Sequence, residues 1–100
     1  MPDATIVTAK RSPVSPDDAD VTITALRALA WLVGDAERCS RFFGLTGLSP
    51  TDLRERAGEP ALQGAVLTFL AGNEADLLAC ADALDLSPET LGLAARSLAA

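Results

Sequence analysis

The chain has 100 residues, of which 49% are hydrophobic and only 4% aromatic, and its formal net charge is −6. This length and hydrophobic content predict one folded domain whose core consists mainly of alanine and leucine. The negative charge disfavours non-specific attraction to nucleic acids and anionic membranes, which are themselves negative, and is typical of a cytoplasmic protein.

The first 14 residues are predicted to form a flexible tail, because Pro2, Pro13 and the pair Lys10-Arg11 interrupt any helical period. This segment has no continuous apolar stretch, so it does not resemble a signal peptide. Nowhere does the chain approach the roughly 18 apolar residues of a membrane span, and no membrane attachment is expected. A single helical domain is therefore expected over residues 15–100.

The first helix is expected to begin at Ser15-Pro16-Asp17-Asp18 and to end at Gly34. Serine at the cap accepts a backbone N–H, proline is tolerated at the first helical position, and acids in the first turn suit the helix dipole. Apolar residues at steps of three and four predict the buried face of this helix. These residues are Ile23, Leu26, Ala30 and Val33.

A second and a third helix are expected between residues 35 and 58. Asp35 is placed to cap the second helix, and Gly44 and Gly47 are expected to break it. Its predicted inner stripe consists of Ala36, Cys39 and Phe43. The third helix is expected to start at Ser49-Pro50-Thr51-Asp52 as a capping box, with Leu48 and Leu53 at the positions of a hydrophobic staple.

Three more helices are expected after Gly58, starting at Glu59-Pro60, Asn73 and Ser87-Pro88. Their predicted inner residues are Leu62, Val66, Phe69 and Leu70, then Leu77, Cys80, Ala81 and Leu84, then Leu91, Ala94, Ala95 and Leu98. No strand is expected after residue 16. The sequence thus predicts an all-α fold, a compact bundle of about five to six short helices.

An internal similarity relates the two halves of this bundle. The segment Leu48–Leu53 returns in similar form as Leu86–Leu91, 38 residues later, and eight identities relate residues 29–57 to residues 67–95. A period of this length is typical of a repeated helical unit and predicts two pseudo-repeated three-helix halves. Most of the identities are leucines or turn residues, so a shared way of starting helices explains the match equally well.

The residues that most enzymes need are missing. With no histidine, the chain cannot form a Ser-His-Asp or Cys-His arrangement, and Cys39 and Cys80 are too few to hold a metal. The segment Gly44-Leu45-Thr46-Gly47 lacks the lysine and hydroxyl residue of a phosphate-binding loop. We therefore expect no catalytic residue, no cofactor site and no metal site.

Aromatic residues are the candidates for contact with a partner. Trp31 is either a core anchor or a partly exposed contact residue. Phe42 and Phe43 are adjacent, so on a helix they diverge by about 100°, and one of them is expected to face a groove or a second subunit.

Four arginines in the central section suggest an alternative function. Arg38 and Arg41 are three residues apart and share a helix face, so they could bind a phosphate or a carboxylate together. With Arg54 and Arg56 they could also serve a helix-turn-helix-like unit over residues 35–57 that binds nucleic acid. Four acids lie close enough in sequence to neutralise them: Asp35, Glu37, Asp52 and Glu55.

Four segments carry a resemblance to a known family: Ala25–Leu32, Arg41–Leu48, Asp52–Pro60 and Ala65–Leu70. Together they resemble a family of short, helical alphaproteobacterial proteins catalogued as a domain of unknown function. The resemblance covers roughly residues 18–90. It implies a helical fold and a bacterial cytoplasmic source, and it brings no catalytic residue with it.

Composition and motifs together favour a small non-enzymatic module that works through protein–protein contact. The expected partner is an unidentified protein, and a second copy of this chain is one candidate. Binding of nucleic acid or another anion through the four arginines is the alternative, although the charge disfavours nucleic acid. A third hypothesis is a ligand-binding or enzymatic bundle with a small pocket between the two halves. It has the weakest support because suitable polar residues are few.

Overall fold

The computed structural model describes the backbone of residues 18–99 and the side chains of residues 20–99. The tail expected over residues 1–14 and the helix start expected at Ser15-Pro16 lie outside this range. Within it the chain forms six helices and no strand, which confirms the predicted all-α fold. The helices are α2 (Asp18–Val33), α3 (Ala36–Thr46), α4 (Pro50–Arg56), α5 (Pro60–Ala71), α6 (Glu74–Leu84) and α7 (Pro88–Ala99).

Local capping residues set the starts of four helices, as predicted. The side chains of Asp35 and Asn73 each accept a hydrogen bond from the backbone N–H three residues on, at the starts of α3 and α6. Ser49 and Asp52 form the expected capping box of α4. At the start of α7, the Ser87 hydroxyl accepts a hydrogen bond from the Thr90 N–H (3.1 Å). Each of these contacts satisfies a backbone donor that the helix leaves free.

The end of α3 differs from the prediction at one glycine. Gly44 was expected to break the helix, but α3 continues through it to Thr46. The helix ends at Gly47, whose φ of 77° lies in the left-handed region that glycine adopts without steric cost. An interior glycine only weakens a helix, so the conformation at Gly47 decides where α3 stops.

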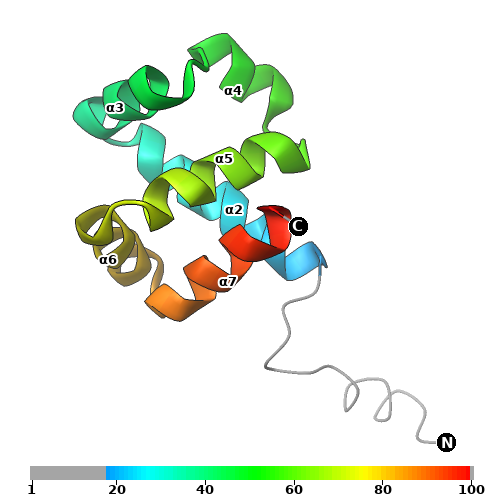
Figure 1. The fold of residues 1–100 in the computed structure, drawn as a ribbon, viewed down its shortest axis with the longest axis vertical. Helices are drawn as coiled ribbons and strands as arrows, with labels where there is room; N and C mark the ends of the chain where they lie inside the picture. Colours follow the sequence, from blue (N-terminus) through cyan, green and yellow to red (C-terminus); the bar gives the residue numbers. More distant parts are fainter. Residues whose placement is uncertain (1–17, 100) are drawn as a thin grey trace, which may run out of the picture.

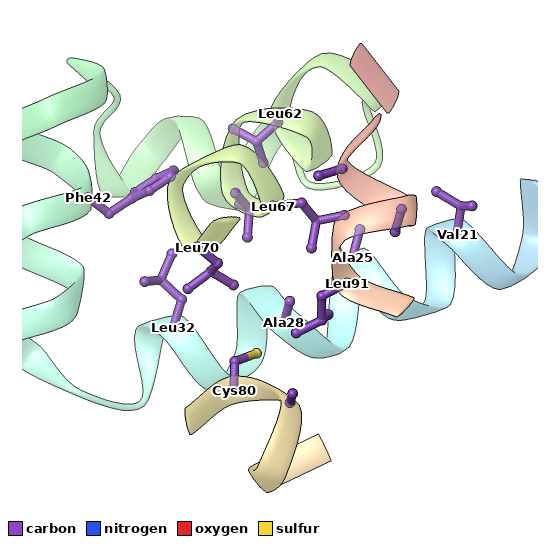
Figure 2. Close-up of a cluster of buried hydrophobic side chains, with 14 of the residues drawn as sticks. Val21, Ala25, Ala28, Leu32, Phe42, Leu62, Leu67, Leu70, Cys80 and Leu91 are labelled. Atoms are coloured by element: carbon purple, nitrogen blue, oxygen red, sulfur yellow. The ribbon is translucent and has the colours of Figure 1, made fainter. Parts of the chain in front are cut away.

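Helix α5 is the centre of the fold. It crosses the molecule in front of α2, with α3 and α4 on one side of it and α6 and α7 on the other (Figure 1). Half of its residues are buried: Leu62, Gln63, Gly64, Val66, Leu67 and Leu70. Even the polar Gln63 is satisfied there, because its Nε2 donates to the Ala57 carbonyl oxygen (3.0 Å). The apolar side chains of α5 meet those of α2, α6 and α7 in one core (Figure 2).

The buried face of α2 is not the predicted one. Its core residues are Val21, Ala25, Ala28 and Leu32, whereas the predicted stripe of Ile23, Leu26, Ala30 and Val33 is exposed. Both stripes have steps of three and four residues, so the spacing alone could not distinguish them. The buried stripe contains two alanines, whose small side chains let neighbouring helices approach closely.

The inner face of α3 also differs from the prediction. Phe42 is fully buried, whereas Cys39 and Phe43 are half-buried and Ala36 is exposed. Phe42 is held in the core by edge-to-face contacts with Phe43 and with Phe69 of α5. The inner residues predicted for α5, α6 and α7 all lie in or against the core, which confirms those three stripes.

The two predicted pseudo-repeated halves differ in the length of their closing helix. Helices α3 and α6 have 11 residues each, but α4 has 7 and its counterpart α7 has 12. Helix α5, which would open the second half, packs extensively against α2 of the first. The halves therefore share one core.

No single helix among the described residues is long and apolar enough to cross a membrane. The pair α5 and α6 meets the length and composition criteria only when taken together, and these two helices are bent by 112° where they join.

Two glycines are expected to respond oppositely to substitution. A Cβ on Gly64 would lie 3.4 Å from the Leu98 Cβ, whereas a Cβ on Gly44 would meet nothing within 4 Å. Gly64→Val should lower the free energy of unfolding by about 1–3 kcal/mol through crowding of α7. Gly44→Ala should raise it by about 0.5–1 kcal/mol, because alanine favours the helix. Urea denaturation measures both, and a neutral Gly64→Val would refute the close α5–α7 approach.

Cys80 should make the fold sensitive to high pH. Burial raises the pKa of its thiol from 9.0 to about 11, against the opposing effect of Arg38 and Arg27. As the pH rises, the thiol ionises in the unfolded chain before it ionises in the folded one. The stabilisation from the neutral buried thiol is therefore fully present below about pH 9. The free energy of unfolding then falls as the pH rises through 11, by on the order of 2 kcal/mol. The chain has no tyrosine, whose phenol would ionise over the same pH range. Urea midpoints between pH 8 and 11 should fall less for Cys80→Ala, and equal slopes would contradict the assignment.

Candidate functional site

Trp31 and Arg38 pack together where α2 meets α3. The Arg38 Cζ lies 3.6 Å from the centroid of the Trp31 ring, a cation–π arrangement. Its Nη2 also donates to the Trp31 carbonyl oxygen (3.2 Å), and Nη1 lies 4.0 Å from the Asp35 carboxylate. Trp31 is half-buried and packs against the core. One face of this candidate contact residue is therefore covered by its own chain.

Arg41 binds a carboxylate, but an internal one. Its two terminal nitrogens donate to both oxygens of Asp76 on α6, at 2.9 and 3.3 Å. Asp76 is only 8% exposed, and the hydrogen bond to it raises the pKa of Arg41. The guanidinium carbon also lies 5.9 Å from the ring centroid of Phe69. This contact, which we call the Arg41–Asp76 clamp, ties α3 to α6.

Arg54 and Arg56 have partners close to α4. Arg54 Nη2 donates weakly to the Thr51 hydroxyl (3.4 Å), and Arg56 Nε donates to Glu59 (2.9 Å). The hydrogen bond to Glu59 raises the pKa of Arg56. The structure thus gives each of the four candidate arginines a different partner within the chain.

Phe42 and Phe43 diverge as expected, but the inner one is out of reach of a partner. Phe42 is 0% exposed, so it is the member of the pair that faces the core. It makes edge-to-face contacts with Phe43 (centroids 5.8 Å apart) and with Phe69 (5.3 Å). Phe43 remains half-buried. This row of three rings joins α3 to α5.

An apolar hollow of about 440 Å³ lies beside this aromatic row, and we call it the α3–α5 groove. Its lining residues are Leu45, Thr46, Ala65, Thr68, Phe69, Gly72 and Asn73. None of the seven is ionisable. At 76%, Leu45 is the most exposed of the large hydrophobic residues in the described chain.

The walls of the groove are held in place by hydrogen bonds. The Thr46 hydroxyl donates to the Phe42 carbonyl oxygen (2.7 Å) and accepts from the Leu48 N–H (3.2 Å). On the other side, Asn73 Oδ1 accepts from the Asp76 N–H (3.0 Å), and the clamp fixes Asp76 in turn. The groove is therefore largely preformed, which lowers the entropic cost of binding.

Sequence reasoning missed Leu45 and assigned Phe69 to the core alone. Leu45 lay within a stretch interpreted as a break, so it received no role. The available signal was an apolar residue directly after a helical aromatic pair and before Gly47. Among the described residues no cluster of three or more metal-ligating side chains occurs. The mostly apolar lining of the groove suits contact with an apolar side chain.

Removing the Asp76 carboxylate should loosen α3. In Asp76→Asn the charged pair with Arg41 is lost, so amide hydrogens of α3 should exchange faster, and the effect should shrink in high salt because salt already weakens the wild-type pair. Glu74→Gln is the matched control, since it removes an exposed carboxylate from the same first turn of α6. Equal exchange in the two variants would mean that the clamp does not hold α3.

Comparison with known proteins identifies a family but adds no function. No curated protein and no solved structure matches the chain. A family model described as a protein of unknown function (DUF3572) matches residues 17–100. This match confirms the resemblance to a family catalogued as a domain of unknown function. The chain therefore belongs to the DUF3572 family.

Proposed function

We infer that this protein is a non-enzymatic helical module that binds another protein through the α3–α5 groove. The observation that carries the proposal is a preformed apolar hollow, lined by no ionisable residue, with Leu45 on its edge. Binding energy at protein interfaces concentrates in anchor side chains that fill such pockets. An apolar side chain projecting from the partner is the expected occupant.

Two features favour a protein partner over a small polar ligand. The Thr46 hydroxyl and the Asn73 side-chain oxygen already have hydrogen-bond partners in the chain. Small-molecule sites use a few convergent polar groups to orient their ligand. Because these polar groups already form hydrogen bonds within the chain, the groove favours apolar contacts, which the side chains of Leu45 and Phe69 can make.

The contacts of three of the four arginines support a protein partner over nucleic acid. Arg41 and Arg56 are paired with carboxylates, and Arg38 is stacked on Trp31. A basic surface needs donors that can reach phosphates, and a net charge of −6 opposes their approach. The proposal takes the cytoplasm as the compartment, in keeping with two free cysteines.

Affinity capture from an extract of the source cells tests the groove. Wild-type protein should retain a partner that Leu45→Glu and Thr68→Arg lose, because each change places a charge in the hollow. Leu78→Glu is the matched control: it alters a leucine on α6 that is 49% exposed and outside the groove. Measured affinity for the captured partner should fall at least about 30-fold for Leu45→Glu, as at other interface anchors.

The same three variants can also refute the proposal. If all three variants are folded by circular dichroism and retain the same proteins as the wild type, the groove is not the binding site. A partner lost by Leu78→Glu but kept by Leu45→Glu would move the site to α6.

A further inference from the structure

Helix α2 carries a second apolar face that nothing in the described fold covers. Ile23, Leu26 and Val33 are 56%, 41% and 47% exposed, and Ala30 is also exposed. We call these four residues the α2 seam. They lie on the helix face opposite Val21, Ala25, Ala28 and Leu32, which are buried against the rest of the bundle. In Figure 1, α2 runs behind α5.

The seam is uncharged over its whole length. Arg27 is the one charged residue between Ile23 and Val33, and its Nη2 donates to the Leu84 carbonyl oxygen (2.7 Å) at the end of α6. That contact holds the guanidinium beside the seam, against the chain's own α6. A solvent-facing helix surface normally carries charged or polar residues, so this apolar face suits contact with another helix.

The spacing of the seam matches that of a helix-pairing surface. Steps of three, four and three residues between Ile23, Leu26, Ala30 and Val33 are those of the a and d positions of a heptad pattern. The seam is about 15 Å long at the helical rise of 1.5 Å per residue. A helix with the same spacing fits it best, and every other copy of this chain has one.

In an antiparallel pair of α2 helices, each large seam residue would face a smaller one from the other copy. Leu26 of one copy would lie opposite Ala30 of the other, and Ile23 opposite Val33, so a larger residue meets a smaller one in every layer. A parallel pair would place Ala30 on Ala30 and leave a gap between larger layers, which costs stability. Antiparallel helix dipoles also attract each other.

The area of the seam sets the expected affinity of the dimer. Two helices in contact over about three turns bury roughly half of a standard interface of about 1,600 Å². Contacts of that size suit a transient complex and not a permanent one. We propose that the protein forms a weak, two-fold symmetric dimer through the α2 seam, with the two helices antiparallel and a Kd of roughly 10 µM to 1 mM.

Sedimentation equilibrium from 10 µM to about 2 mM tests this dimer. Wild-type protein should shift from monomer toward dimer over this range, whereas Leu26→Glu and Ala30→Glu should each dimerise with at least a tenfold higher Kd. Both positions are exposed, so both variants should fold, and circular dichroism checks this. Leu45→Glu is the control: it alters the groove, leaves the seam unchanged and should still dimerise.

A wild-type monomer at all concentrations would overturn the proposal. If Leu26→Glu then also lost a cellular protein that the wild type retains, the seam would bind that protein instead of a second copy. The result is independent of the groove, because Leu45→Glu and Leu26→Glu separate the two surfaces.

Disulfide cross-linking tests the orientation. Ile23→Cys and Val33→Cys proteins, both with Cys39→Ser, are mixed and oxidised, while the buried Cys80 stays out of reach. The antiparallel pair should give mainly the mixed 23–33 product. Predominant 23–23 and 33–33 products would overturn the antiparallel arrangement.

Discussion

The close approach of neighbouring helices to α5 is the constraint on which the rest of the structure depends. Gly64 allows Leu98 of α7 to lie against the α5 backbone, and Ala25 and Ala28 give α2 a narrow inner face. With few aromatic residues, the core gains its stability from this tight fit of leucine, valine and alanine. Space that α5 does not fill is filled by Phe42, reaching in from α3.

The α3–α5 groove follows from the same use of small residues. Where the end of α3 passes α5, the facing residues include Ala65 and Gly72, which are too small to fill the gap that Leu45 and Phe69 border. The Arg41–Asp76 clamp and the aromatic row then hold α3 at this distance from α5. The groove is thus produced by the packing of the bundle and kept open by a polar contact between helices that are distant in sequence.

Whether a feature of the fold could be predicted from the sequence depended on how far apart in the chain the interacting residues lie. The caps at Asp35, Ser49, Asn73 and Ser87 join residues three apart, so sequence patterns located the helix starts correctly. The prediction of the inner face of α2 was wrong because two stripes had the same spacing. The helices that pack against α2, chiefly α5 and α7, decide which stripe is buried. The partner of Arg41 lies 35 residues away on α6, and no local pattern identifies it.

The exposed seam of α2 is partly a consequence of the core itself. Turning the alanine-containing stripe inward lets α5 and α7 approach, and it leaves Ile23, Leu26 and Val33 outside. Core packing does not, however, determine which residues those outer positions hold. The exposed positions of α6 and α7 include Glu74, Asp82, Glu89 and Arg96, as solvent requires. Helices α6 and α7 each expose a single large apolar residue, Leu78 and Leu93, whereas α2 exposes three at heptad spacing. This row is the reason to regard the seam as a binding surface and not as a remainder of folding.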